Sequence, residues 1–578
     1  MSFSRRSLLV GAVSGVGLTA AGALAFGDHE AAYAAGDIAT VNSYRAQVVV
    51  VGGGVGGVAA ALGALRNGAT VVLTEETDWI GGQFTSQLVP ADEHRWIEPS
   101  TGAYGQTLAY KSLRAAVRQF YKTHYPVTEA FKTNTQPNPG NAWVSRIAAD
   151  PAVWRMCMWQ LLMPYLAAGK LSILLGHRPV SATKNGAAIT AVGLEGPDGA
   201  IREVSGSYFI EATELGDLLP VVGATSWVGR EKGGPSGTNE LHNTNPTEDS
   251  DDQQGFTMVM ALGYDRTRAD VLDHRISKPA SYETHRPTFA SFFAANLFDP
   301  SRDYAYADGP NFWQYRRVAA LSSFTPGAFI EEVSLINYPC NDFKTGNLVG
   351  VDDAVKQANI EAAKELSLSL LYYLQYESPR PDGGGTGYPA LRLRTDVTGT
   401  MDGIAKAPYV REARRLVGLG RIAEWHIGVD NRVQLLGKPA DQLTAATFAD
   451  SVGTGHYWID VHPGPKNPNG LWIRSYTYQI PLFAMISRNL DNLLAGGKTI
   501  NTSHITNGAY RVHPTEWNIG ESAGVLAAYC LSGNTNPKTL RSTSATLTAF
   551  QSHLRAQGIQ TDWPSTTRNQ WLKPPTGA

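Results

Sequence analysis

The hydrophobic pattern is clearest near residue 50, where an unbroken apolar run predicts a buried strand. Residues 48–51 are four consecutive valines, which is typical of a strand covered on both faces. A glycine-rich turn follows, and then a small-residue stretch, 55–67, which predicts a helix that ends at Gly68. A second apolar run, 70–74, leads into Glu75. This order of strand, turn, helix and strand predicts a βαβ unit with parallel strands.

Further along the chain the pattern alternates between helical and strand-like stretches. Helical spacing of apolar residues predicts helices near 107–125, 150–168 and 352–376. A β-rich run, 171–210, contains a Pro-Asp-Gly turn and predicts an antiparallel meander. Between about 226 and 480 the chain becomes rich in polar loops and aromatic segments. This change of character predicts a second domain inserted into the first.

The turn after the first strand has the chemistry of a dinucleotide site. Gly52, Gly54 and Gly57 stand at G-x-G-x-x-G spacing, and the helix that would follow begins at Val55. Glycine permits the tight turn and lets the backbone approach a pyrophosphate, while the helix N-terminus offers free N–H groups to the anion. Glu75 can accept hydrogen bonds from an adenosine ribose and would repel a 2′-phosphate. The motif therefore favours FAD or NAD over NADP.

Several later segments resemble the FAD-dependent oxidoreductases with a glutathione-reductase-type fold. Gly81, Gly82 and Gln83 resemble the glycine loop of that family near the flavin, and 212–218 resembles its A-T-G turn with Glu214 in place of the usual glycine. A strand ending in glycines, 491–498, and an Ala-rich helix reaching about Leu531 resemble the family's C-terminal return to the cofactor. The resemblance implies FAD, with these cofactor-binding residues: Gly52, Gly54, Val55, Gly57, Glu75, Gly81, Gly82, Gln83, Gly497, Asn518, Gly520, Glu521 and Ser522.

The resemblance also implies a fold class and a division of the chain. We expect an α/β protein with a Rossmann-like FAD-binding domain, a β-meander and a large inserted α+β substrate domain. The expected units are a signal peptide (1–34), the first part of the FAD-binding domain (45–225, with the meander at 171–210), the substrate domain (226–480), the C-terminal part of the FAD-binding domain (481–535), and a C-terminal helix and tail (536–578). Two domains also suit a chain of 578 residues.

The net charge excludes some classes of partner, and the N-terminal segment predicts a route of export. The net charge is −2, so nothing indicates a nucleic-acid partner. Ser4 to Leu9 resembles a twin-arginine export signal, and 32–34 is an A-x-A-like cleavage site. We therefore expect a partner in the twin-arginine translocation machinery, a periplasmic or extracellular location, and no stable membrane span after cleavage. The three cysteines form no disulfide framework and no metal-ligand pattern.

Candidate catalytic residues flank the loop before the C-terminal helix. His504 and His513 could act as the base that removes a proton while a hydride leaves a C–H bond, and Arg511 could hold an anionic group. His456 and Tyr457 are weaker candidates in the substrate domain. The segment Pro408 to Arg415 resembles an element of one exported bacterial FAD-oxidoreductase group, but its charges could equally form a surface salt-bridge helix.

These features predict an exported FAD-dependent dehydrogenase or oxidase acting on a small-molecule substrate. Oxygen, a quinone or a small carrier is the expected electron acceptor, because NAD(P)H is not maintained outside the cytoplasmic membrane. The alternatives are an NAD-requiring hydrolase that uses transient hydride transfer, a flavin-dependent monooxygenase, and a flavoprotein kept for binding rather than turnover.

Overall fold

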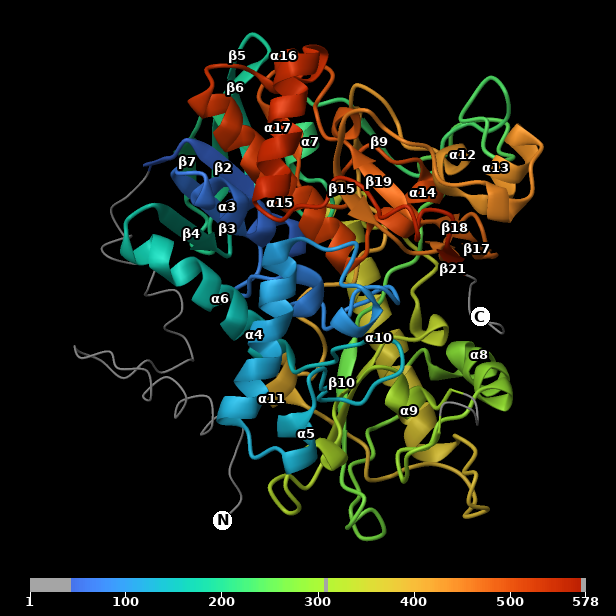
Figure 1. Ribbon diagram of the computed structural model, residues 1–578. Coiled ribbons are helices and arrows are strands. Elements are labelled where there is room, and N and C mark those ends of the chain that lie inside the picture. Colours follow the sequence, from blue (N-terminus) through green and yellow to red (C-terminus); the bar gives the residue numbers. More distant parts are fainter. Residues whose placement is uncertain (1–42, 306–309, 573–578) are drawn as a thin grey trace.

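A five-stranded parallel sheet forms the centre of the larger part of the protein (Figure 1). The computed structural model describes residues 43–305 and 310–572. The sheet has the order β20-β8-β2-β3-β4, with β2 Val48–Val51, β3 Val71–Glu75, β4 Leu171–Leu175, β8 Tyr208–Glu211 and β20 Leu493–Ala495. The first strand of this sheet in sequence, β2, lies in the middle, and the last, β20, lies at one edge. Segments distant in sequence therefore meet beside β2.

Two helices cover one face of this sheet and pack tightly against each other. Helix α3 (Val55–Arg66) follows the glycine turn and contacts β2, β3 and β8. Helix α15 (His513–Ser532) contacts β2, β8, β20 and α3. Both helices are almost wholly buried, which explains why their sequences are dominated by small and apolar residues instead of showing one polar face. The βαβ unit expected from the sequence is therefore present.

A separate four-stranded sheet adjoins the parallel one. Its order is β1-β7-β6-β5, with β1 Ser43–Arg45, β5 Arg178–Asn185, β6 Ala188–Glu195 and β7 Ile201–Ser205. Strands β5, β6 and β7 pair antiparallel as a meander, and β1 adds in parallel to β7. The antiparallel part is narrower than the predicted range of 171–210, because β4 and β8 at its two ends belong to the parallel sheet.

The helices expected before the meander are present within a residue of their predicted bounds. They are α4 (Leu108–His124) and α6 (Pro151–Ala167), with the short α5 (Glu129–Thr133) between them and α7 (Leu218–Val221) after β8. Thr107 caps α4 by accepting from the N–H of Tyr110, and Asp150 caps α6 in the same way through Ala152.

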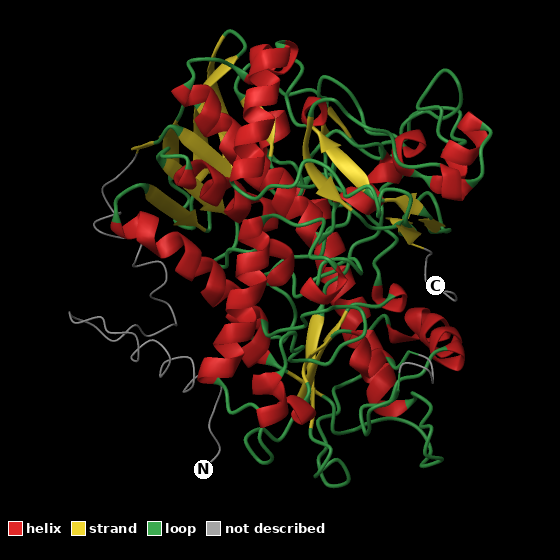
Figure 2. Cartoon of the chain, in the orientation of Figure 1, coloured by secondary structure: helices red, strands yellow, loops and turns green. Residues whose placement is uncertain are grey.

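A second hydrophobic core lies around another four-stranded sheet, seen in the lower half of Figure 2. The sheet order is β11-β12-β10-β13, with β10 Met260–Tyr264, β11 Arg317–Ala319, β12 Glu332–Ile336 and β13 Arg392–Leu393. Its helices are α8 (Tyr282–Ala295), α9 (Phe312–Tyr315), α10 (Asp353–Tyr376) and α11 (Thr395–Thr398). Helix α10 corresponds to the long helix expected at 352–376.

The stretch after about residue 415 returns to the first core. Its helices are α12 (Glu424–Ile427), α13 (Val429–Leu436) and α14 (His504–Tyr510). Strand β14 (Arg415–Leu416) pairs with β9 (Ser226–Trp227), which lies earlier in the chain. The other strands of this stretch pair as β15–β19, β16–β17 and β18–β21, with β15 Ser451–Gly455, β16 Ile459–Val461, β17 Leu471–Ile473, β18 Ser475–Tyr476, β19 Tyr478–Pro481 and β21 Trp571–Leu572. Strand β15 packs on α15, so the second half of the predicted substrate domain shares a core with the parallel sheet.

Two helices rather than one follow α15. They are α16 (Pro537–Ser542) and α17 (Ser544–Ala556), and both contact α15. Among the described residues, none of the helices combines the length and apolar character that a membrane crossing requires. The predicted signal segment, 1–34, lies outside the described residues.

Candidate functional site

The glycine turn between β2 and α3 can be built only from glycine. Gly52 has a φ of +102°, and a Cβ at this position would lie 2.2 Å from the carbonyl oxygen of Ala212. A Cβ at Gly57 would lie 1.8 Å from the carbonyl oxygen of Gly52. Strand β8 and the first turn of α3 thus press on the loop from both sides. Gly54 is the N-cap of α3, so the free N–H groups of that helix open at this turn, beside the Glu214 carboxylate.

Glu75 lies beside this turn, as its position at the end of β3 predicts. Its carboxylate accepts the N–H of Gly53 at 2.9 Å and the hydroxyl of Thr77 at 2.8 Å. Burial raises the pKa of Glu75 to about 8. A buried carboxyl group fixed at the second strand of a βαβ unit is suited to hydrogen bonds with ribose hydroxyls.

The second glycine loop lies directly against the first. Gly81 donates its N–H to the carbonyl of Gly53 at 2.8 Å, and a Cβ at Gly82 would lie 2.9 Å from the Cα of Gly54. Gln83 extends from this loop toward α15, where its amide donates to the carbonyl of Arg511 at 3.0 Å and to the Glu516 carboxylate. The two glycine loops therefore lie in direct backbone contact.

Helix α15 approaches α3 through glycines on both helices. A Cβ at Gly520 would lie 2.0 Å from the carbonyl oxygen of Gly56, and one at Gly524 would lie 1.9 Å from that of Ala60. A Cβ at Gly63 would in turn lie 2.5 Å from the carbonyl oxygen of Glu521. This contact places the first turn of α15 beside the glycine turn, with Glu516 near Gly497. Burial raises the pKa of Glu516 to about 7.

Three predicted cofactor residues on α15 direct their side chains into the protein instead. Asn518 donates to the carbonyl of Thr454 at 3.1 Å, and Ser522 donates to that of Val452 at 2.9 Å. Glu521 accepts from the indole N–H of Trp517 at 2.9 Å. In this structure these side chains fasten α15 to β15 and stabilise the helix itself.

Arg511 and His513 lie together at the junction of α14 and α15. Arg511 donates to the hydroxyl of Tyr409 at 2.9 Å and to the backbone carbonyl of Asp460 at 2.9 Å. The Nδ1 of His513 accepts the N–H of Asp92 at 3.1 Å, and burial lowers the pKa of His513 to about 4. His513 is therefore neutral at pH 7.

His504 belongs to a different network, two helical turns from Arg511. Its Nδ1 contacts Glu412 at 2.9 Å, and its Nε2 faces a guanidinium nitrogen of Arg230 at 3.3 Å. Glu412 also pairs with Arg415, which reaches Glu231 at 3.1 Å. The structure does not bring His504 to Arg511 and His513. His456 is also buried, where its Nε2 faces the carbonyl of Ser475 at 3.4 Å.

The segment Pro408 to Arg415 is not a surface helix. It is extended, and Tyr409, Arg411, Glu412 and Arg415 are all buried. Arg411 pairs with Asp342 at 2.8 Å, and Tyr409 contacts Arg511 as described. The surface salt-bridge alternative is therefore wrong. The mixture of charged and aromatic residues here is buried because it joins the two cores.

Sequence reasoning missed the polar groups that the inserted region contributes. Arg316 follows α9 and pairs with Asp92 at 3.2 Å, while His462 lies between Asp342 (2.7 Å) and Asp460 (3.2 Å). Burial alone would raise the pKa of Asp460, but His462 and the nearby guanidinium groups lower it to about 2. No local motif marks these residues, because loops distant in sequence bring them together.

Asp92, Arg316, Asp460, Arg511 and His513 form one connected group, the Arg511 cluster. This cluster contains buried polar atoms that have no partner among the described residues. They are the Nε atoms of Arg316 and Arg511, and Oδ1 of Asp460. Buried polar atoms normally have hydrogen-bond partners. Gln83, which follows Gly82 in the second glycine loop, donates to the backbone carbonyl of Arg511 and to Glu516. The cluster therefore lies next to the glycine loops, and its unpartnered atoms are a candidate substrate site.

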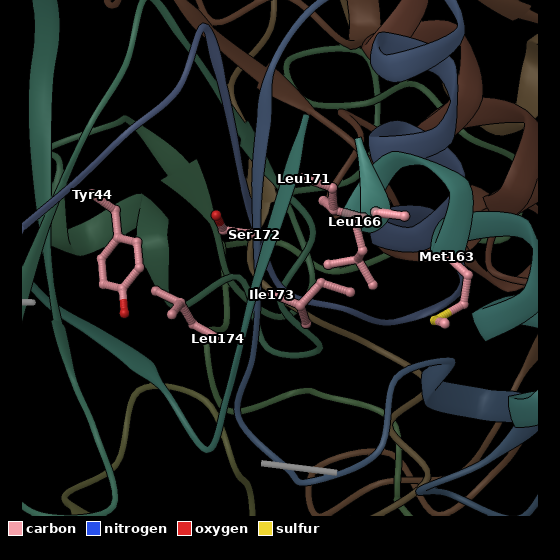
Figure 3. Close-up of a pocket in the computed structure, with 8 residues that line it drawn as sticks. Tyr44, Met163, Leu166, Leu171, Ser172, Ile173 and Leu174 are labelled. Carbon is pink, nitrogen blue, oxygen red and sulfur yellow. The ribbon is translucent and has the colours of Figure 1, made fainter. Parts of the chain in front are cut away.

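A site could also lie in the pocket beside β4, at the cysteines or among the acidic and histidine side chains. A pocket of about 260 Å³ lies along edge strand β4 (Figure 3), where it is lined by Tyr44, Met163, Leu166, Ala167 and residues 171–174. None of the predicted site residues lines it. All three cysteines are buried and free, and burial raises the pKa of Cys157 to about 12. Within 43–305 and 310–572, no cluster of potential metal ligands occurs.

Comparison with known proteins identifies the family. The profile of the family described as FAD dependent oxidoreductase matches residues 47–554. No curated protein sequence matches the chain.

Similar solved structures include L-proline dehydrogenase from P. horikoshii (17% identity, 29% of this chain, 22% of that chain, TM-score 0.16). They also include an E. coli quinol fumarate reductase (10%, 89%, 74%, 0.30) and a geranylgeranyl bacteriochlorophyll reductase-like protein from Thermoplasma acidophilum (10%, 90%, 85%, 0.30). The match to the first of these spans only 22% of its length, and all three TM-scores are low, so the assignment depends on the profile match. Because that match covers most of the chain, the protein belongs to the FAD dependent oxidoreductase family.

Proposed function

We propose that this protein is an exported FAD-dependent dehydrogenase or oxidase that takes a hydride from a small polar organic substrate. The observation that supports the proposal most strongly is the Arg511 cluster, which places unpartnered buried polar atoms next to the glycine loops. The proposal includes export by the twin-arginine route and transfer of electrons to oxygen, a quinone or another carrier. Family membership favours an FAD-dependent oxidoreductase over the alternative of an NAD-requiring hydrolase.

The residues present fit FAD. A Cβ at Gly54 or Gly82 would meet the Glu214 carboxylate, so the bare backbone of both loops could face a pyrophosphate once that side chain moves. Glu75 is positioned for the ribose, and the first turn of α15 directs its dipole toward the same region. When bound, FAD supplies the two-electron redox chemistry.

The chain's own residues would bind and orient the substrate. The Nε–H groups of Arg511 and Arg316 can donate to a substrate oxygen. The Oδ1 of Asp460 can accept from a substrate O–H or N–H, because the low pKa of Asp460 keeps it ionised. His513 is neutral and can donate from Nε2. We assign His504 a structural role, since Glu412 and Arg230 engage both of its ring nitrogens.

An anaerobic screen tests this proposal. The FAD-loaded protein is mixed with small alcohols, amines, and hydroxy and amino acids, and flavin absorbance is followed. We expect at least one class to bleach the flavin, and Arg511→Met to slow the bleaching without loss of bound FAD. Bleaching by NADPH alone, with a substrate that becomes hydroxylated in air, would instead establish a monooxygenase.

A further inference from the structure

An internal carboxylate lies against the glycine turn. Glu214 follows β8, and its Oε1 would lie 2.4 Å from a Cβ at Gly54 and 2.5 Å from one at Gly82. This oxygen is buried and has no hydrogen-bond partner among the described residues. The Glu214 carboxylate therefore lies close to the N-terminus of α3, where the free N–H groups and the helix dipole favour an anion.

The other oxygen of Glu214 is paired with a buried cation. Lys498 follows the glycines after β20, and its side chain is 1% exposed. Its Nζ donates to Oε2 of Glu214 and to the carbonyl of Val410 at 3.0 Å. Burial alone would lower the pKa of Lys498, but the Glu214 and Glu516 carboxylates raise it. Lys498 is thus a charged group fixed beside the turn.

The ion pair at the turn leaves no net positive charge for a dianionic ligand. Lys498 is the cation that contacts Glu214, and the neighbouring carboxyl groups of Glu75 and Glu516 add no positive charge. A pyrophosphate that approached Gly54 would meet the Glu214 carboxylate at that position. Two anions cannot share this space at low cost, since like charges a few ångströms apart repel strongly in a buried site.

We infer that the Glu214 carboxylate occupies the diphosphate position of the glycine turn. The diphosphate of the cofactor would displace this carboxylate and form an ion pair with Lys498 in its place. Lys498 is then a cofactor-binding residue, and Glu214 limits cofactor affinity. The inference rests on the FAD cofactor of the proposed function and is independent of the substrate. It explains the acidic residue at a position where the resembling family usually has glycine.

The test compares FAD affinity in three variants of the full chain. FAD is removed and the apoprotein is titrated with FAD at fixed pH and ionic strength, while quenching of flavin fluorescence is measured. E214Q keeps the shape of the side chain and removes the charge, so we expect it to lower the dissociation constant by about tenfold. K498M should raise the constant by a similar factor. K498M alone leaves the Glu214 carboxylate without its buried cation. The double variant E214Q/K498M should therefore have a higher free energy of unfolding than K498M, because no buried carboxylate loses its partner.

Asp217→Asn is the matched control. Asp217 lies in the same turn as Glu214, but its carboxylate pairs with Arg414 at 3.0 Å. It should leave FAD affinity within about twofold of the wild type. Titration with ADP, which carries a diphosphate but no flavin, should reproduce the E214Q effect.

Four outcomes would overturn the inference. Weaker FAD binding by E214Q would make Glu214 a ligand and not a competitor. Equal affinities of E214Q and the wild type, or an equal gain in Asp217→Asn, would show that position 214 has no specific effect. If the wild type binds no FAD, the proposed function fails as well, which distinguishes the two failures.

Discussion

Replacing Gly520 by alanine should separate α3 and α15, the two helices beside the proposed cofactor site. The added Cβ would lie 2.0 Å from the carbonyl oxygen of Gly56, whereas ordinary contact begins at 3.4 Å. The backbones must therefore move apart by about 1.4 Å. Neither partner can yield by rotating a side chain, because the clash is with main chain. Overpacking of this kind costs about 1–3 kcal/mol or more.

We expect Gly520→Ala to weaken FAD binding more than a glycine substitution at the far end of α15 does. Gly56 lies in the first turn of α3, so any shift of its carbonyl also moves the N–H groups of the glycine turn. If about 1.4–2.8 kcal/mol of this strain is expressed in binding, the dissociation constant rises by about 10- to 100-fold. The assay is a fluorescence titration of the apoprotein, with thermal unfolding measured at one scan rate.

Gly533→Ala is the control on the same helix. Gly533 is the C-cap of α15, and a Cβ there would meet the carbonyl oxygen of Tyr529 at 3.3 Å. We expect FAD affinity to stay within about twofold of the wild type. Equal FAD affinity in Gly520→Ala and Gly533→Ala would refute the conclusion that close packing of α15 on α3 positions the glycine turn.

Three other perturbations test separate parts of the site. Glu412→Gln should lower the free energy of unfolding by about 3–5 kcal/mol, because Arg415 and His504 lose a buried charged partner; an unchanged thermal midpoint would contradict this. Asp460→Asn should slow flavin reduction by the identified substrate at least about tenfold with FAD content unchanged, and a rate equal to the wild type would remove Asp460 from the substrate site. Burial raises the pKa of Glu211 to about 8 from an ordinary 4.5, so its stabilising effect is complete below pH 4.5 and is lost as the pH rises through 8. Stability should therefore fall between pH 4.5 and about 8 by roughly 1.4 kcal/mol per pH unit for each such group, and denaturant unfolding of Glu211→Gln should show a shallower fall.

Most of the cofactor region could be predicted because its determinants are local. The valine run, the glycine spacing and Glu75 lie within thirty residues of one another, and each reflects a backbone requirement that sequence alone expresses. The loop at Gly81 and Gly82 was also predictable, since positive φ angles at both positions require glycine. The role of Gly520 differs in kind, because it serves helix packing and the predicted ligand contact stays untested.

The substrate cluster could not be predicted in the same way. Asp92, Arg316, Asp460 and Arg511 come from four segments that are separated in sequence, with Asp460 on β16 and Arg511 at the end of α14. Their meeting depends on how the inserted region returns to the first core. A sequence pattern normally predicts that isolated charged residues are exposed to solvent, yet Arg511 is only 3% exposed. Of the predicted catalytic residues, Arg511 and His513 lie together, while the structure separates His504 from them. The roles of all three stay predictions.

An absorption spectrum of the purified protein, recorded before and after denaturation and during anaerobic reduction, tests the central claim most directly. We predict flavin bands, release of about one FAD per chain on denaturation, and bleaching on reduction. A Gly54→Val variant, whose side chain would meet the Glu214 carboxylate, should fold and lose the bands. A colourless protein that takes up no added FAD, or a Gly54→Val variant that retains full FAD content, would contradict the assignment of the glycine turn as the cofactor site.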